Sequence, residues 1–293
     1  MEIVPLPDAA AFLEAADPVL HRDAAANNLP LGIAQNLIDR PEAYDEAFFW
    51  VVQRAGTIVG AALRTPPYPL VLVEPVEAAA IGALVSALAG GRPAVPGVTA
   101  NEPWATRFAE AWGAATGAAW DVAIGQGVYA LTSVRAPRPA RGSSRLATLE
   151  DRSLLVRWMH EFEIEALQAM TRDEHAIERA LETRLGEGDS SGFSLWDDEG
   201  RAVSLAGWTR IPGGARIGPV YTPPDERGRG YASNLVAEVS RSMLDAGASA
   251  CFLYTDLGNP TSNAIYRRIG YDQVAESLMI TFQEPARRAP RNG

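Results

Sequence analysis

Cysteine and lysine are almost or entirely missing from this chain of 293 residues. Cys251 is its single cysteine, and all 26 of its basic residues are arginines. One cysteine cannot form a disulfide bond within the chain, which is typical of a reducing compartment, so we expect a cytoplasmic protein. Because Cys251 lies in a short apolar segment, we expect its thiol to be buried and unreactive.

Long apolar runs and a basic N-terminal segment are missing as well. The longest apolar stretches, such as residues 78–89, fall well short of the ~20 residues that a membrane-spanning helix needs. The first residues, MEIVPLPDAAAFLEAADP, contain an early acid, prolines and no basic residue. They do not resemble a signal peptide, and we expect no association with a membrane.

Positive charge is in deficit, because 36 acidic residues stand against 26 basic ones and give a net charge of −10. Both halves of the chain are acidic, so we expect no nucleic-acid partner; a cationic substrate such as an amine is favoured instead. Histidine is also scarce. His21, His160 and His175 are scattered without the spacing of metal ligands, so we interpret them as structural and expect no metal.

The length predicts two domains, and a hydrophobic fraction of 47% is ordinary for a globular protein. The clearest break is RAPRPARGSS at 135–144, which is rich in Pro, Arg, Gly and Ser and has no apolar periodicity. We interpret it as a linker between a domain at 1–134 and a domain at 145–284, followed by a frayed tail at 285–293.

The hydrophobic patterns of the two halves predict helices and strands in similar order. We therefore expect an α/β (α+β) fold of two lobes, each a mixed central sheet flanked by helices. Thr148 and Asp151 fit a capping box before the first helix of the second half. The helices are expected at 8–16, 28–39, 75–89, 103–115, 149–169, 173–186, 230–246 and 260–269. The strands are expected at 47–53, 58–63, 70–73, 97–99, 121–134, 193–196, 203–209, 215–221, 250–255 and 273–282, where 121–134 is either a strand hairpin or one long bent strand.

One segment carries clear chemistry: GPVYTPPDERGRGYASNLVAEV at 218–239 is a strand, a glycine-rich turn and a helix. The first N–H groups of a helix have no partner within it, and the helix dipole places partial positive charge there, so this turn suits a pyrophosphate. A Walker P-loop is excluded because it needs a lysine. A dinucleotide fingerprint is weak, because its third glycine is replaced by Ser233.

The pattern Arg227-x-x-Gly230-x-Ala232 resembles the acetyl-CoA signature of the GNAT superfamily of N-acetyltransferases. The downstream run NPTSNAIYRRIGY at 259–271 resembles the second motif of that family. The element order of the second half fits the GNAT fold as well. The two-lobed layout resembles bacterial tandem GNAT proteins in which one copy is degenerate.

The resemblance implies acetyl-CoA as co-substrate and a role for each matching residue. Tyr266 would be the general acid that protonates the leaving thiolate, although a buried core tyrosine is the alternative reading. Asn259 and Asn263 would hydrogen-bond the cofactor, unless Asn263 is only a local polar group of its helix. The backbone of the splayed strand, at Pro219, Val220 and Tyr221, would pair with the pantetheine, and the turn Arg227, Gly228, Arg229, Gly230, Tyr231 and Ala232 would hold the pyrophosphate.

The general base is less well defined. Glu161 and Glu165 are four residues apart, so they share one face of the expected helix, which borders the acceptor cleft in the GNAT fold. They are candidate bases, with a solvated acidic face or a chain of water molecules as alternatives. Asp225, Glu226 and Asp256 are weaker candidates.

The first half lacks these features. VEPVEAAA at 73–80 and EPWATRFAEAW at 102–112 have no glycine turn and no tyrosine at the matching places. We expect this lobe not to bind CoA, to pack against the second half and to shape the substrate cleft, with Trp104, Trp112 and Trp120 in its core.

The sequence thus predicts an acetyl-CoA-dependent N-acetyltransferase that acts on a primary amine, most simply of a small molecule, by direct attack in a ternary complex. The alternative is a non-catalytic acyl-CoA-binding protein with a regulatory or structural role. Either a monomer or a homodimer is consistent with the sequence.

Overall fold

A computed structural model describes residues 1–91, 94–166, 181, 184–185 and 190–283. The chain forms two compact units, and neither is continuous in sequence. The first consists of Met1–Asp23, Tyr44–Gly125 and Glu276–Gly293, and the second of Ala24–Ala43 and Gln126–Ala275.

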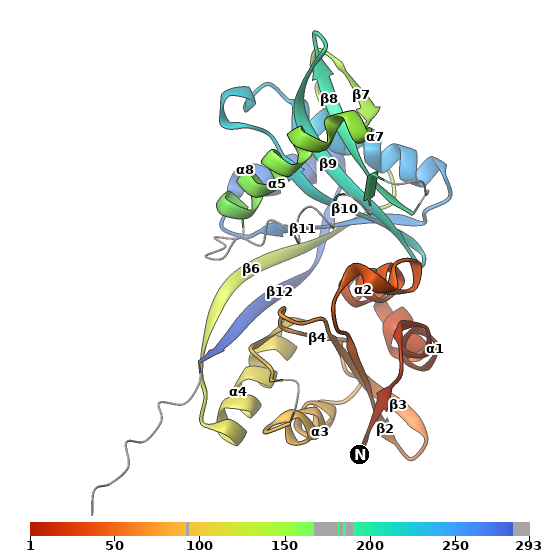
Figure 1. Ribbon diagram of the computed structural model, residues 1–293, viewed down its shortest axis with the longest axis vertical. Helices are drawn as coiled ribbons and strands as arrows, with labels where there is room; N and C mark the ends of the chain where they lie inside the picture. Colours follow the sequence, from red (N-terminus) through yellow and green to blue (C-terminus); the bar gives the residue numbers. More distant parts are fainter. Residues whose placement is uncertain (92–93, 167–180, 182–183, 186–189, 284–293) are drawn as a thin grey trace, which may run out of the picture. The chain divides into compact units, whose positions relative to one another are not determined.

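The sheet of the first unit has the order β1–β2–β3–β4–β5–β12. Its strands β1, β2, β3 and β4 are antiparallel neighbours, and β4 and β5 are parallel. Its core joins the sheet to helices α3 and α4 and includes Trp112, with Trp104 and Trp120 packed against it, as expected (Figure 1). The elements are β1 (Glu2–Leu6), α1 (Ala9–Leu20), β2 (Phe48–Arg54), β3 (Thr57–Arg64), β4 (Leu70–Leu72), α3 (Ala79–Leu88), β5 (Gly97–Asn101) and α4 (Trp104–Thr116).

The sheet of the second unit has the order β6–β11–β10–β9–β8–β7 and carries a hydrophobic cluster on each face. Side chains alternate between the faces along β9, so that Leu205 packs with α5 and Ala206 packs with α7. The elements are α2 (Asn28–Asp39), β6 (Ala119–Leu131), β7 (Ser143–Leu146), α5 (Arg152–Ala166), β8 (Ser191–Asp198), β9 (Arg201–Ile211), β10 (Gly214–Tyr221), α7 (Tyr231–Asp245), β11 (Ala250–Asp256), α8 (Pro260–Ile269) and β12 (Asp272–Gln283). Two of these strands are divided between the units, since residues 119–125 of β6 and 276–283 of β12 lie in the first unit.

The two halves of the sequence exchange a strand. In the second unit β6, which precedes the expected linker, pairs antiparallel with β11 from Cys251↔Leu131 to Asp256↔Gln126. In the first unit β12, the last strand of the chain, pairs antiparallel with β5 from Ser277↔Asn101 to Thr281↔Gly97. Helix α2 also belongs to the second unit. The domain boundary predicted at 135–144 does not account for the exchanged strands or for the place of α2.

Most expected elements are present within one to four residues of their predicted ends. The capping box of Thr148 and Asp151 is confirmed, and it starts a 3-10 turn at Leu149–Asp151 that leads into α5. The first strand of each half of the chain was not predicted. Strand β1 contains Pro5, and the exposed β7 has a single apolar residue, so neither shows a clear strand pattern. The prediction that all of 135–144 is linker was wrong at its end, since β7 begins at Ser143 and pairs with β8. Most of the expected helix at 173–186 and all of the tail at 285–293 lie outside the described residues.

Candidate functional site

Strands β10 and β11 separate part-way along their length. They pair in parallel only from Gly214↔Ala250 to Arg216↔Phe252, although β10 continues to Tyr221 and β11 to Asp256. Beyond Arg216 and Phe252, the backbone N–H and C=O groups of the two strands are no longer paired with one another. An extended ligand with amide groups can pair with such an exposed strand edge. The splayed strand expected from the sequence is therefore present.

An irregularity in β10 lies at the start of this separation. The register of β10 against β9 shifts between Ile217 and Val220, and the Gly218–Pro219 peptide bond is cis. Gly207 on β9 makes room for this bulge, because a Cβ there would lie 2.7 Å from the carbonyl oxygen of Gly218 and 2.9 Å from Cδ of Pro219. The two glycines thus allow the backbone at Pro219 to lie close over β9.

The turn after β10 presents backbone N–H groups. Gly228 and Gly230 have φ angles of +79° and +85°, which favour glycine, and Gly230 is the N-cap of α7 without any side-chain cap. Within the described part of the chain, nothing accepts a hydrogen bond from the N–H groups of 228–233. These groups and the dipole of a 15-residue helix suit an anion such as a pyrophosphate.

The arginines of the turn are engaged in ion pairs. Nη2 of Arg227 lies 2.5 Å from Oε2 of Glu165 on α5, and its Nε donates to the carbonyl oxygen of Thr222 at 2.8 Å. Nη1 of Arg229 lies 2.9 Å from the buried Glu226, whose other oxygen lies 2.5 Å from Nη2 of Arg201. Both arginines of the turn are about half exposed, so their guanidinium groups can also reach an anion at the turn.

The hydroxyl of Tyr231 does not face an open site. It donates to Oδ2 of Asp198 at 2.6 Å, and the tyrosine is buried. This hydrogen bond is the main reason why the pKa of Tyr231 is raised. Only the backbone N–H of Tyr231 is therefore suited to an anion at the turn, as is that of Ala232.

The two candidate bases meet at one phenol. Tyr221, at the end of β10, donates its hydroxyl to Oε1 of Glu165 at 3.2 Å, and Glu161 also hydrogen-bonds it. Burial first and then these two carboxylates raise the pKa of Tyr221. The shared helix face of Glu161 and Glu165 is thus confirmed, and it faces β10.

Tyr266 is buried with its hydroxyl unengaged. It lies on α8 in the same cluster as Ile217 and Val220 of the splayed strand, with the ring of Tyr271 edge-on at 6.0 Å. No described residue hydrogen-bonds its hydroxyl. Burial raises its pKa to about 12, so the phenol keeps its proton at neutral pH.

The two candidate asparagines differ in exposure. Asn259 is exposed and caps α8, accepting a hydrogen bond from the N–H of Ser262 at 3.1 Å. Asn263 is buried and its side-chain amide is fully engaged by Asp256, Asn259 and Tyr129. Sequence reasoning missed Tyr129, Asp198 and the pair of Glu226 with Arg201, because each of these contacts joins residues from distant segments.

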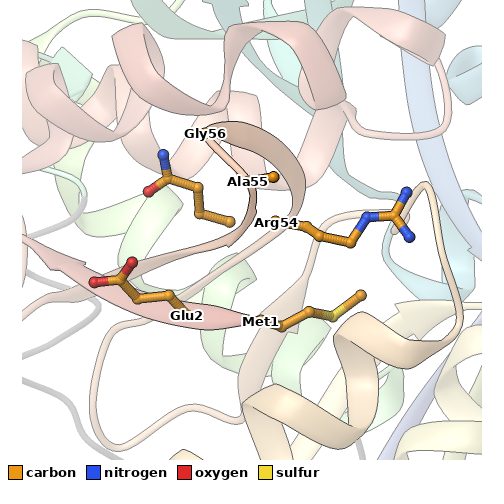
Figure 2. A pocket seen from close by; sticks show the side chains of 6 residues that line it. Met1, Glu2, Arg54, Ala55 and Gly56 are labelled. Atoms are coloured by element: carbon orange, nitrogen blue, oxygen red, sulfur yellow. The ribbon is translucent and has the colours of Figure 1, made fainter.

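The described residues include two hollows of similar volume. One of about 390 Å³ lies beside the turn and is bounded by Glu161 and Trp158 of α5, by Arg201, and by Asp225 and Glu226. The other, of about 340 Å³, lies in the first unit at the turn between β2 and β3, where the side chains of Met1 and Arg54 extend to the same side (Figure 2). This second hollow has none of the sequence-predicted site residues.

Other expectations concern the rest of the chain. Cys251 is buried, as expected, and burial raises the pKa of its thiol to about 12. Among the described residues, no cluster of three or more His, Cys, Asp or Glu side chains could hold a metal ion. No helix in the described ranges is long and apolar enough to cross a bilayer. In the first unit, Glu77 lies in the segment that matches the Gly228–Gly230 turn. Its Oε1 lies 2.7 Å from Nη2 of Arg54.

Comparison with known proteins agrees with this geometry. Residues 198–280 match the FR47-like protein family. The mycothiol acetyltransferase of Streptomyces coelicolor is 30% identical over 107 residues, which are 35% of this chain and 34% of that protein. That of Nocardiopsis dassonvillei is 34% identical over 87 residues, 30% of this chain and 26% of that protein. The chain thus spans between a quarter and about a third of the length of these curated relatives.

Solved structures match the whole chain. A tandem GNAT protein from the clavulanic acid biosynthesis pathway has a TM-score of 0.57 at 17% identity, covering 98% of this chain and 100% of that one. A GCN5-related N-acetyltransferase from Sphaerobacter thermophilus has a TM-score of 0.58 at 18% identity, and the match covers 98% of this chain and 97% of that one. The chain therefore folds as two GNAT-like lobes. Its residues 198–280 are similar to the FR47-like family, and its fold is that of GNAT proteins.

Proposed function

We propose that this chain is an acetyl-CoA-dependent N-acetyltransferase that acetylates a primary amine of a small molecule by direct attack in a ternary complex. The observation that carries the proposal is the opening of β10 from β11 after Arg216, with the Gly228–Gly230 turn at the end of β10. An exposed strand edge and an anion-binding turn in sequence are what a pantetheine joined to a pyrophosphate requires.

The donor set of the site fits acetyl-CoA. Backbone N–H groups of 228–233 would hold the pyrophosphate, with Arg227 and Arg229 as charged donors. The free edge of Pro219–Tyr221 would pair with the pantetheine, and Asn259 would contact it from the other side. When bound, acetyl-CoA supplies the activated acyl group.

Tyr266 is the proposed general acid. Its phenol is buried and keeps its proton until the pH approaches 12, and no described residue competes for that proton. The departing thiolate would take this proton only while the two groups are in contact, as general acid catalysis requires. The resulting phenolate would regain its proton from solvent.

Glu161 is the proposed base, or the anchor of a water that acts as one. It bounds the hollow of about 390 Å³ and hydrogen-bonds Tyr221 at the end of β10. Glu165 is the second candidate, but its carboxylate is already engaged by Arg227. Three carboxylates, those of Glu161, Asp225 and Glu226, line this hollow beside two arginines, Arg157 and Arg201. This small acidic excess and the net charge of −10 favour a cationic acceptor. The single buried Cys251 supports a cytoplasmic location.

The test is release of free thiol from acetyl-CoA with a panel of primary amines, together with calorimetric binding of CoA. The panel includes amino sugars, polyamines, amino acids and the acceptor of mycothiol acetyltransferases. The full chain is compared with Tyr266→Phe and with Tyr68→Phe, an exposed tyrosine of the first unit. We expect Tyr266→Phe to bind CoA normally and to lose about 100-fold or more in kcat, with Tyr68→Phe unchanged.

Other outcomes are equally decisive. Tight binding of CoA without turnover of any amine would favour a non-catalytic acyl-CoA-binding protein. A Tyr266→Phe variant that keeps its full rate would remove the acid assignment and leave the transferase intact. No binding of CoA at all would reject the proposal.

A further inference from the structure

Asn263 holds the segment between β11 and α8 from the inside. Its Nδ2 donates to the carbonyl oxygen of Asp256 at 2.9 Å and to that of Asn259 at 2.7 Å. These two bonds use both hydrogens of the amide and connect the end of β11 to the start of α8. The segment lies where β11 has separated from β10, so it borders the same gap as Pro219–Tyr221.

The orientation of that amide is set by Tyr129. The tyrosine hydroxyl donates to Oδ1 of Asn263 at 2.9 Å, and both side chains are buried. A longer contact of 3.3 Å joins the hydroxyl to Oε1 of Gln273, so Asn263 is the better acceptor. With Oδ1 occupied by Tyr129, the Nδ2 group can point only toward the two carbonyls.

Tyr129 comes from the half of the chain that lacks the CoA motif. It lies on β6, opposite Leu253 of β11, and its ring is fully buried. Gly127 leaves room for this ring, because a Cβ there would lie 2.6 Å from Cε2 of Tyr129. The exchanged strand therefore brings a buried phenol to the segment 256–263 from outside the sequence of the motif.

We infer that Tyr129 is a positioning residue for the binding of acetyl-CoA: through Asn263 it fixes the segment 256–263 that borders the opening between β10 and β11. The inference rests on the proposed function of that opening. It also assigns a role to the first half of the chain, which supplies β6 and thereby completes the site of the second half.

The test uses the full-length chain and Tyr129→Phe, which removes the hydroxyl and keeps the ring. We expect the Kd for CoA and the KM for acetyl-CoA to rise about tenfold, because a buried amide loses the partner that orients it. The kcat should stay within about threefold, since Tyr266 is untouched. A general loss of stability would not produce this split between KM and kcat.

Tyr271→Phe is the matched control for CoA binding. Tyr271 is also a fully buried phenol of this unit, and its hydroxyl bonds with Ser240 at 2.7 Å rather than with the segment 256–263. We expect its Kd for CoA to stay within about twofold of the wild type while its melting temperature falls as much as that of Tyr129→Phe.

A double-mutant cycle tests the route through Asn263. The variant with both Tyr129→Phe and Asn263→Ala should bind CoA no more weakly than Asn263→Ala alone, because the first residue acts through the second. If Tyr129→Phe does not fold, Gly127→Ala, which displaces the ring of Tyr129 and keeps its hydroxyl, should show the same rise in Kd.

The outcomes separate the two proposals. A wild-type chain that does not bind CoA overturns the proposed function. A wild-type chain that binds CoA, with Tyr129→Phe binding equally tightly or with additive effects in the cycle, overturns the positioning role and leaves the proposed function standing.

Discussion

Arg227 and Glu165 form an ion pair, with Nη2 and Oε2 2.5 Å apart. Arg227 belongs to the turn that suits a pyrophosphate, and Glu165 is a candidate base on α5. The pair therefore links the two roles that sequence reasoning assigned separately: Glu165 holds the arginine beside Tyr221 and competes with an anion at the turn for its charge.

The first prediction concerns this pair. Glu165→Gln should release Arg227 and strengthen binding of CoA about two- to fivefold, because a competing carboxylate is removed from the anion site. The free energy of unfolding should change by less than about 1 kcal/mol, since both side chains are more than 40% exposed. Calorimetry with CoA measures the affinity, and Arg227→Gln should weaken binding in the same assay. Weaker binding by Glu165→Gln would show that the carboxylate orients Arg227 instead.

A second prediction concerns the bulge of β10. Gly207→Ala should cost about 1–3 kcal/mol of stability and weaken CoA binding, because the new Cβ meets backbone atoms of Gly218 and ring atoms of Pro219 that cannot rotate away. Gly82→Ala is the matched control, since a Cβ at Gly82 of α3 meets nothing within 4 Å and alanine is the better helix former. Denaturant unfolding and calorimetry check both. An unchanged Kd for Gly207→Ala would mean that the bulge does not shape the binding edge.

The strand exchange gives a third prediction. Gly97→Ala should destabilise the chain by about 1–3 kcal/mol, because its Cβ would meet the carbonyl oxygen of Ile280 on β12. Hydrogen exchange should then increase at the amides of 277–281, which pair with β5. Protection at β12 that is the same in the variant and the wild type would contradict the pairing of β12 with β5.

The fourth prediction concerns alkaline pH. Burial raises the pKa of Tyr266 from 10.0 and that of Cys251 from 9.0, each to about 12, and raises the pKa of Tyr271 as well. In each case the unfolded chain loses a proton at a lower pH than the folded chain. This stabilising contribution is complete below about pH 9 and is lost as the pH rises toward 12.

The free energy of unfolding should therefore fall between pH 9 and pH 12, by up to about 1.4 kcal/mol per pH unit for each group that differs in ionisation. Urea unfolding of the full chain at pH 8, 9, 10 and 11 measures the slope. Cys251→Ala should make the slope shallower above pH 9, and Tyr271→Phe should do so above pH 10. A free energy that stays constant up to pH 11 would show that these groups are not buried.

The sequence alone was sufficient for local structure and for the chemistry of the turn. Gly228, Gly230 and the helix that follows them are contiguous, so their backbone geometry and their unpaired N–H groups follow from nearby residues. The shared face of Glu161 and Glu165 likewise follows from helix periodicity. The apolar patterns determined most of the element order of the described part of both lobes, with β1 and β7 missed, and the burial of Cys251 followed from its apolar strand.

Only the tertiary structure decided which strands pair and which side chains meet. The exchange of β6 and β12 leaves no local signal, because a strand has the same alternation whichever neighbour it pairs with. For the same reason the contacts of Arg227 with Glu165 and of Tyr129 with Asn263 cannot be read from spacing, since the partners are separated by 62 and 134 residues. The sequence determined most of the elements and the backbone of the Gly228–Gly230 turn, and long-range packing determined what surrounds them.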